Sequence, residues 1–264
     1  MSVSQLARSI KASPTLKLNE TAAKLREKGE PVIHLGGGEP KSKAPLDAVL
    51  NCATQLNTGE IRYAPADGLP ALKKAILRYT EENYGQMLAP QNVIVSSGAK
   101  QSIMNLLYAI LEPKDEVVYP APYWVSYPEM AKLAGGVGVA VTPEDGSFQP
   151  SVPDIADKVG SYTKAIILNS PNNPSGVMYS RDFVAEIVAF CEKKSLWLVM
   201  DDLYNRLVFD GQKAPNPFDF AKVTGEASKL VVVQGVSKMY AMTGFRIGWC
   251  VANKDLITTM DIFQ

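Results

Sequence analysis

The segment GVSKMYAMTGFRIG, at residues 235–248, holds one lysine and one arginine among small and apolar residues. Lysine is rarely buried without a partner, so Lys238 needs a reason to stand in this setting. One interpretation is a solvated strand–turn–strand segment. The other is a chemical pair, in which the Lys238 amine attacks a carbonyl group and Arg246 binds an anion. Such an amine needs a pKa below about 10.4, which nearby positive charge and partial burial supply.

Two adjacent aspartates end the apolar run in LWLVMDDLY, at residues 196–204. Side chains alternate between the two faces of a strand, so only Asp201 shares a face with Trp197. An ionised carboxylate at a buried strand end needs a cation or several hydrogen-bond donors. A protonated ring nitrogen would serve, and Tyr204 could donate its hydroxyl nearby. The alternative is that Asp201 and Asp202 form a solvated turn or a helix cap.

Three further segments place polar or aromatic residues where a strand ends: SSGAKQS (96–102), PAPYWVSYP (120–128) and NSPNNPSG (169–176). The first is a strand–glycine–helix junction, and a helix N-terminus binds anions through its free N–H groups. In the second, Trp124 could lie flat against a planar heterocycle. In the third, a rigid asparagine could donate a hydrogen bond to a ring oxygen. Each has a structural alternative: an ordinary turn, a core tryptophan, and a turn rich in Asn and Pro.

Together, the five sites describe a ligand with a flat aromatic cation, a phosphate tail, a phenolate oxygen and an aldehyde. Pyridoxal 5'-phosphate carries all four groups. The segment SSGAKQS lacks the glycine-rich lead of a nucleoside-triphosphate loop, and neither HLGGGEP nor GGVGVA fits the GxGxxG pattern of nicotinamide-binding folds. The sequence therefore predicts a pyridoxal phosphate site and disfavours a nucleotide site.

Short apolar runs alternate with amphipathic stretches along the chain. Strands are predicted at residues 92–97, 116–120, 136–141, 164–169, 196–202 and 229–234, and helices at about 15–28, 72–85 and 98–111 and after Ser180. This alternation implies an α/β fold with a mostly parallel central sheet flanked by helices. Ligands of such sheets bind beyond the carboxyl ends of the strands. We expect an N-terminal arm and helix at 1–33 and one large domain at 34–264.

The composition limits which classes of partner and which cellular location are expected. With 27 basic and 27 acidic residues among 264, the chain is balanced in charge, which disfavours nucleic acid and anionic membranes as main partners. Three scattered cysteines and the single histidine, His34, disfavour a disulfide framework, a metal site and histidine-based catalysis. Without a signal core or a membrane-spanning run, a cytoplasmic protein is expected. The final stretch, VANKDLITTMDIFQ, reads as the start of a helix in which the chain stops, so we expect a fragment.

On these segments the chain resembles the class I and II aminotransferases of fold type I, which depend on pyridoxal phosphate, and most resembles the prokaryotic aspartate aminotransferase subgroup. The similarity runs from about Leu6 to the last residue. GVSKMYAMTGFRIG fits the family's lysine signature at every restricted position, and APYWVSYPEM, NSPNNPSG and RYAPADGLPALKKAI agree in order and spacing. The resemblance implies the large domain of this fold, with the small C-terminal domain missing.

The resemblance also implies roles for the residues at matching positions. Lys238 would form a Schiff base with the cofactor and move a proton between Cα and C4', while Asp201 would pair with the pyridinium nitrogen. Tyr63 would reach the phosphate of a neighbouring subunit, which implies a homodimer. Gly38 would approach the substrate α-carboxylate through its backbone. The other implied contacts are Trp124, which stacks on the ring, Asn173 and Tyr204 at its phenolate oxygen, Trp124 and Asn173 at the substrate, and Ala99, Lys100, Ser237 and Arg246 at the phosphate.

Three features depart from the family pattern. Gly235 stands where many relatives carry a hydroxyl, three residues before the lysine, which leaves one phosphate donor fewer. Lys41 and Ser42 replace the usual acidic–aromatic pair near the substrate entrance. The family's carboxylate-binding arginine lies beyond residue 264, so we expect residues 1–264 alone to transaminate poorly or not at all.

The predicted activity is transfer of an amino group between an amino acid, with aspartate favoured, and a 2-oxo acid, with 2-oxoglutarate favoured. A pyridoxal phosphate-dependent lyase acting at Cβ or Cγ is a close alternative, because its cofactor site would be nearly identical. A non-catalytic cofactor-binding sensor module is a further, less favoured alternative.

Overall fold

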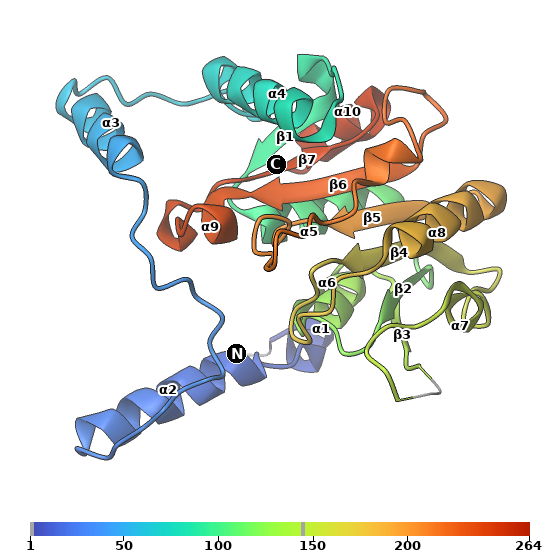
Figure 1. Ribbon diagram of the computed structural model, residues 1–264, viewed down its shortest axis with the longest axis horizontal. Coiled ribbons are helices and arrows are strands. Elements are labelled where there is room, and N and C mark those ends of the chain that lie inside the picture. Colours follow the sequence, from blue (N-terminus) through green and yellow to red (C-terminus); the bar gives the residue numbers. More distant parts are fainter. Residues whose placement is uncertain (1–2, 144–145) are drawn as a thin grey trace.

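A seven-stranded sheet forms the centre of the computed structural model, which describes residues 3–143 and 146–264 (Figure 1). The strand order is β1-β7-β6-β5-β4-β2-β3. Strand β7 runs antiparallel to its neighbours β1 and β6, and the other pairings in the described sheet are parallel. The prediction of an α/β fold with a mostly parallel sheet is therefore confirmed.

The strands are built from apolar, β-branched runs, as buried strands require. Their bounds are β1 (Val93–Ser96), β2 (Glu116–Pro120), β3 (Val137–Val141), β4 (Thr163–Asn169), β5 (Trp197–Asp201), β6 (Leu230–Gly235) and β7 (Gly248–Val251). All residues of β6 are buried, because this strand lies inside the sheet. In β3 only Val141 is buried, because β3 is an edge strand.

Helices cover both faces of the sheet (Figure 1). One face packs against α4 (Pro70–Tyr84), α7 (Val152–Ala156) and α8 (Arg181–Lys194). The other face packs against α5 (Ala99–Ile110), α6 (Ser126–Leu133) and α10 (Lys254–Ile262). Each large aliphatic side chain buried in these two layers contributes about 1.5–3 kcal/mol, so the layers hold the sheet rigidly. The remaining short elements are α9 (Val236–Met239), η1 (Pro90–Asn92), η2 (Pro217–Asp219) and η3 (Thr243–Phe245).

The N-terminal helices lie outside these layers. Helices α2 (Pro14–Glu27) and α3 (Leu46–Asn57) stand apart from the sheet (Figure 1), with Ala22 the one buried residue of α2 and none buried in α3. Helix α1 (Gln5–Ser9) reaches α6, where Lys132 Nζ donates to the Ser9 carbonyl at 3.0 Å. Helix α2 agrees with the predicted helix at about 15–28.

One strand is missing from the sequence prediction. The stretch VANKDLITTMDIFQ predicts a helix, but its first residue, Val251, ends β7, and α10 begins at Lys254. The helix starts there because Asn253 caps it, accepting a hydrogen bond from the Leu256 N–H at 2.8 Å. Strand β7 then forms because residues 248–251 pair on both sides, with β1 and β6.

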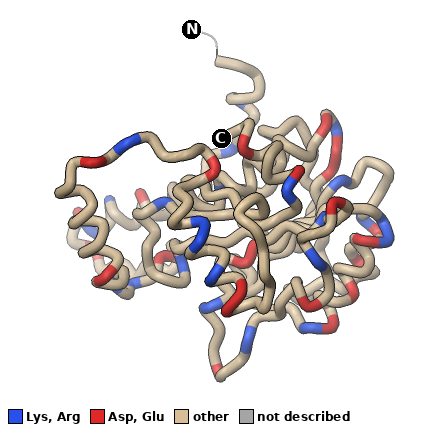
Figure 2. Tube along the Cα trace, turned by 90° about the horizontal axis from the view of Figure 1, so that it is seen from above, with Lys and Arg blue, Asp and Glu red and all other residues tan. Residues whose placement is uncertain are grey.

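Charged residues of both signs are interspersed over the fold (Figure 2). This distribution agrees with the equal numbers of basic and acidic residues in the sequence. In the described ranges, no helix combines the length and the apolar character that crossing a membrane would require.

Candidate active site

The carboxyl ends of the parallel strands bring the predicted site segments to one edge of the sheet. Strand β4 ends at Asn169, β5 at Asp201, and β6 at Gly235, three residues before Lys238. Strand β1 ends at Ser96, and α5 begins shortly after it. Ligands of open α/β sheets bind at this edge, where the chain leaves the sheet and its side chains are free for chemistry.

A chain of contacts links Lys238 to Asp201 along one side of the site. The Lys238 Nζ lies 6.0 Å from the centre of the Tyr204 ring. Asn173 Nδ2 donates to the Tyr204 hydroxyl at 3.2 Å. The Asn173 backbone N–H donates to Asn169 Oδ1 at 2.6 Å, and Asn169 Nδ2 donates to the Asp201 carbonyl at 2.7 Å. The turn after β4 is therefore fixed to the end of β5.

A second chain of contacts leads away from Asp201 on the other side. The Tyr127 hydroxyl donates to Asp201 Oδ2 at 2.6 Å, and the Tyr127 ring stands perpendicular to the Trp124 ring at 5.5 Å. Lys100 Nζ lies 5.0 Å over the Trp124 ring. Burial lowers the pKa of Lys100, and the nearby Arg246 charge lowers it further.

Lys238 is half-buried on α9, and its Nζ donates to the Gly38 carbonyl at 2.6 Å. Burial lowers the pKa of Lys238, Glu39 acts in the opposite direction, and the Arg246 charge lowers it again. A lower pKa leaves more of the amine unprotonated and nucleophilic at neutral pH. The Arg246 charge lowers the pKa of both lysines, so Arg246 relates the ends of the two chains electrostatically and without a direct contact. We call the set of seven side chains the contact ring: Lys238, Tyr204, Asp201, Tyr127, Trp124, Lys100 and Arg246.

Asp201, the last residue of β5, and Asp202 are both buried, which rules out a solvated turn. They occupy opposite faces of the sheet, as the alternation of side chains predicts: Asp201 accepts from Tyr127 on α6, and Asp202 accepts from Tyr84 on α4. Burial raises the pKa of Asp201 to about 6, although the Tyr127 hydrogen bond lowers it. Among the described residues, the buried Asp201 Oδ1 has no hydrogen-bond partner. That oxygen is complementary to a ligand with a positively charged N–H.

Two glycines allow Arg246 and the first residue of β7 to pack closely against the N-terminus of α5. A Cβ on Gly98 would lie 2.4 Å from Arg246 Nη2, and a Cβ on Gly248 would lie 2.3 Å from the Ala99 backbone nitrogen. Arg246 Nη2 also donates to the Ser97 carbonyl at 3.4 Å. The first N–H groups of a helix have no partner within the helix, and they carry partial positive charge. Together with the guanidinium, they form a corner that can bind an anion such as phosphate.

Replacing Gly98 with alanine should disrupt this anion corner. Gly98 has a φ of +88°, and the new Cβ would collide with the Arg246 guanidinium. We expect the affinity for inorganic phosphate, measured by titration calorimetry, to fall at least about tenfold, or about 1.4 kcal/mol. Gly225→Ala is the matched control, because the space around Gly225 is open. Equal phosphate affinities in the two variants would contradict this assignment.

The other predicted site residues occupy different surroundings. Ser237 is buried on α9, next to Lys238. Tyr63 lies outside the contact ring with its side chain fully exposed. At Gly235 a Cβ would lie 2.9 Å from the Ile247 carbonyl oxygen, so glycine relieves crowding where β6 meets β7. Glycine at position 235, where many relatives carry a hydroxyl, therefore avoids a steric clash with the Ile247 backbone.

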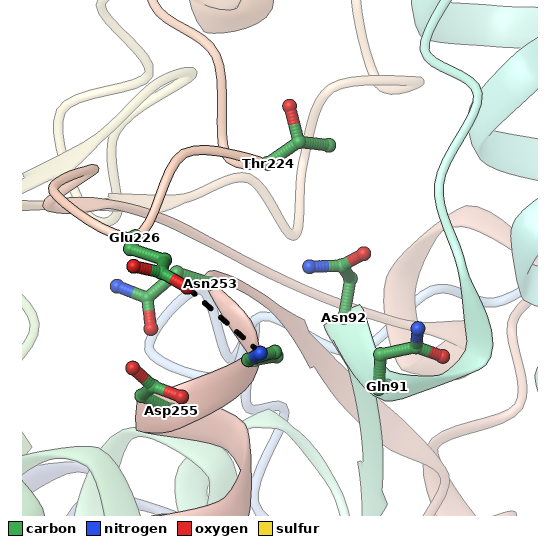
Figure 3. A pocket seen from close by; sticks show the side chains of 7 residues that line it. Gln91, Asn92, Thr224, Glu226, Asn253 and Asp255 are labelled. Atoms are coloured by element: carbon green, nitrogen blue, oxygen red, sulfur yellow. Dashed lines mark ion pairs between the residues drawn. The ribbon is translucent and has the colours of Figure 1, made fainter.

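A small polar pocket of about 180 Å³ lies at the opposite edge of the sheet, near the amino ends of β1 and β6 (Figure 3). It is lined by Gln91, Asn92, Thr224, Glu226, Asn253, Lys254 and Asp255. Its two buried asparagines hold the backbone: Asn92 Nδ2 donates to the Ala252 carbonyl, and Asn253 Nδ2 donates to the Ser228 carbonyl. The buried polar side chains of this pocket are therefore explained by the backbone segments that they hold together.

A larger cleft of about 790 Å³ lies beside the contact ring. Lys100 and Arg246 line it together with Tyr123 and the N-terminal residues 10–14. Because the cleft includes the guanidinium of the anion corner, it gives a small ligand a way to reach the carboxyl edge of the sheet.

Sequence reasoning did not identify several residues that shape the site. Tyr127 lies on α6, which begins at Ser126, whereas Trp124 precedes that helix, so no helical spacing indicated that the two rings meet. Asn169 ends β4 just before a turn that contains further asparagines, so its residue type alone did not distinguish it. Glu39 accepts a hydrogen bond from the Thr243 hydroxyl at 2.5 Å, which ties the loop after Gly38 to the lysine segment; residues this far apart in sequence carry no local signal.

Comparison with known proteins places the chain in a family. The sequence profile for aminotransferase class I and II matches residues 30–264. An aspartate aminotransferase from Streptomyces avermitilis is 39% identical over 259 residues, covering 97% of this chain and 62% of that protein. A probable aspartate/prephenate aminotransferase from Thermus aquaticus is 37% identical over 260 residues, covering 98% of this chain and 66% of that protein. The chain thus spans less than two thirds of the length of these relatives.

Solved structures agree with the sequence comparison. An aspartate aminotransferase from Thermotoga maritima superposes with a TM-score of 0.92 at 33% identity, covering 99% of this chain and 69% of that one. An aspartate aminotransferase from Thermus thermophilus with maleate gives a TM-score of 0.93 at 33% identity, covering 100% of this chain and 68% of that one. The chain belongs to the aminotransferase class I and II family, and the resemblance inferred from the lysine signature is confirmed.

Proposed function

We propose that this chain carries the cofactor site of a pyridoxal phosphate-dependent aminotransferase, with aspartate and 2-oxoglutarate as the favoured amino donor and acceptor. The observation that carries the proposal is the contact ring, which gathers an amine, a buried acid and a guanidinium around one edge of the sheet. When bound, pyridoxal phosphate supplies an aldehyde that links to amines and a ring that withdraws electrons from the substrate Cα.

The ring of the cofactor fits the donors and acceptors at the ends of β4 and β5. The unpartnered Asp201 Oδ1 would hold the positive charge on the pyridine nitrogen, and such a cation would lower the pKa of Asp201 below its value of about 6. Burial raises the pKa of Tyr204 to about 12, so its hydroxyl stays protonated and can donate to the phenolate oxygen. Asn173 would donate beside it, and Trp124 would cover one ring face.

The phosphate of the cofactor fits the anion corner. The backbone N–H groups of Ala99 and Lys100 open helix α5, and Arg246 lies beside them. A guanidinium can form two parallel hydrogen bonds with a phosphate, which fixes orientation as well as charge. The buried Ser237 would add its hydroxyl from α9.

Lys238 would act first as a nucleophile and then as a base. Its lowered pKa favours the free amine, which can attack the cofactor aldehyde. The same amine would also move a proton between the substrate Cα and C4' of the cofactor. The hydrogen bond from Lys238 Nζ to the Gly38 carbonyl supports this role, because the substrate α-carboxylate is expected at the same backbone.

The names of the relatives support an acidic substrate. Two are named for aspartate or for aspartate and prephenate, and one solved structure is described with maleate, a four-carbon dicarboxylate. Trp124 and Asn173 would contact the substrate on either side of the ring. Lys41 and Ser42, in the loop after Gly38, distinguish this chain near the substrate entrance.

The direct test supplies aspartate and 2-oxoglutarate to two cofactor-loaded proteins, residues 1–264 alone and the same chain extended to the length of its relatives. We expect oxaloacetate and glutamate in equal amounts from the extended chain, measured by coupled dehydrogenases, and little or none from residues 1–264 alone. Pyruvate with ammonia would instead identify a lyase, and an extended chain that binds the cofactor but changes neither substrate would fit a sensor module. A protein that develops no visible absorption band with pyridoxal phosphate would refute the proposal.

We also infer a homodimer. Tyr63 is fully exposed, and apolar side chains are exposed along α3, including Leu46, Leu50 and Leu56. Large contiguous apolar patches are uncommon on monomers and mark interaction surfaces. Sedimentation equilibrium at micromolar concentration should therefore give twice the mass of the chain, and a monomer would contradict this inference.

A cytoplasmic location is the third part of the proposal. Cys191 and Cys250 are buried as free thiols, and Cys52 is exposed as a free thiol. Unpaired cysteines are typical of reducing compartments. Fractionation of cells that express a tagged protein tests this assignment, and recovery from an oxidising compartment would contradict it.

A further inference from the structure

A buried polar network occupies the face of the sheet opposite Asp201. We propose that the Asp202 carboxylate, held by Tyr84, is a positioning group that fixes the turn carrying Tyr204 for its contact with the cofactor. This inference rests on the proposed function. The Asp202 network comprises Tyr84, Asp202, Asn205, Gln234 and Trp249.

Three donors from three parts of the fold converge on one oxygen of Asp202. Asp202 is 3% exposed, and its Oδ2 accepts from the Tyr84 hydroxyl on α4. The same oxygen accepts from Gln234 Nε2 on β6 and from Asn205 Nδ2, each at 3.3 Å. The Asp202 backbone N–H also donates to the Val233 carbonyl at 2.9 Å. Asp202 is therefore fixed in both its backbone and its side chain.

The Tyr84 hydroxyl is the second centre of the network. It donates to Asp202 and accepts from both Asn205 Nδ2 and Gln234 Nε2. One donor and two acceptor sites exhaust what a tyrosine hydroxyl can offer. Gln234 uses its other end as well, since its Oε1 accepts from the Trp249 indole N–H at 3.0 Å. Among the described residues, Asn205 Oδ1 is buried without a hydrogen-bond partner, but the other hydrogen bonds of the network join α4, β6 and the turn after β5 and restrict their movement.

The network fixes the turn that carries Tyr204, because it binds residues before and after Tyr204 in the sequence. Asp202 precedes Tyr204 by two residues, Asn205 follows it directly, and both are tied to Tyr84. The turn is closed by the Leu207 N–H, which donates to the Tyr204 carbonyl at 2.7 Å. The Tyr204 hydroxyl meets Asn173 in the site. Loss of the network should therefore act on the cofactor through Tyr204.

A double-mutant cycle tests whether Asp202 acts through Tyr204. The readout is the dissociation constant for pyridoxal phosphate, followed by absorbance. We expect Asp202→Asn and Tyr204→Phe each to weaken binding about tenfold, and the double variant to lose about tenfold rather than about a hundredfold. Tyr84→Phe replaces Asp202→Asn in the cycle if the latter fails to fold. Losses that multiply would overturn the inference, because a general weakening of the fold acts independently of Tyr204.

Hydrogen–deuterium exchange of the cofactor-free protein supplies a second, independent readout. In Tyr84→Phe and Asp202→Asn, amides of residues 203–207 should exchange at least about tenfold faster. Tyr179→Phe is the matched control, because the Tyr179 hydroxyl is buried without a partner among the described residues. Unchanged exchange would overturn the inference alone, whereas failure of the unsubstituted protein to bind pyridoxal phosphate would overturn the proposed function.

Discussion

Replacing Lys238 with alanine is expected to abolish the visible absorption band that the protein acquires with pyridoxal phosphate, and with it amino transfer. The amine is placed 6.0 Å from the centre of the Tyr204 ring and has a pKa lowered by burial. It would serve both as the nucleophile and as the group that moves the proton. Because alanine can neither attack the aldehyde nor move the proton, the substitution should slow amino transfer by at least about 10⁴-fold. Absorbance after dialysis measures the first effect on residues 1–264, and a coupled dehydrogenase assay of the chain extended to the length of its relatives measures the second.

Two control variants separate Lys238 from the other lysines. Lys222 is exposed and lies two residues before Thr224, which lines the small polar pocket at the opposite edge of the sheet, so Lys222→Ala should keep the band and the rate. Lys100 is the informative rival, because burial and the Arg246 charge also lower its pKa. At saturating cofactor, Lys100→Ala should still form the band. A band that survives Lys238→Ala but disappears in Lys100→Ala would show that the wrong amine has been assigned.

Replacing Asp201 with asparagine is expected to slow the chemistry while leaving the cofactor attached. The substitution preserves size and an acceptor for the Tyr127 hydroxyl, which lies 2.6 Å from Asp201 Oδ2, but it removes the charge that would face the pyridine nitrogen. Loss of a preorganised electrostatic partner typically costs about 10²–10³-fold in rate. Stopped-flow absorbance during the reaction of aspartate with the chain extended to the length of its relatives measures this loss.

The control for Asp201→Asn is the same substitution at an exposed aspartate, Asp219. Asp219 is paired with Arg181 at 3.5 Å, and both side chains are substantially exposed. Asp219→Asn should therefore react at the unsubstituted rate, since exposed pairs contribute little. If Asp201→Asn reacts as fast as Asp219→Asn, the buried carboxylate has no part in the chemistry.

The sheet could be predicted from sequence because its signals are local. Runs such as KAIILN and KLVVVQ are continuous in branched apolar residues, and each became a buried strand. Strand β7 was not predicted because GWCV is only four residues long and because its pairing depends on β1, about 155 residues earlier in the chain. The outward placement of α3 could not be predicted either, because its amphipathic pattern is compatible with a buried face that the described chain does not provide.

The site was predictable where one residue type and one strand position suffice. Alternation of side chains separates Asp201 from Asp202, and the structure places them on opposite faces. The Asp202 network was not predictable, because its hydrogen bonds join Tyr84 to residues 118 and 150 positions away. The roles of the ring residues toward a cofactor stay predictions until a ligand is bound.

Borohydride reduction of the cofactor-loaded protein tests the central claim most directly. Reduction converts a carbon–nitrogen double bond to a stable amine, so the attached lysine can be identified by peptide mass spectrometry. The contact ring predicts one pyridoxyl group per chain, carried by Lys238. A label on Lys100, a label spread over exposed lysines, or no label at all would contradict the account.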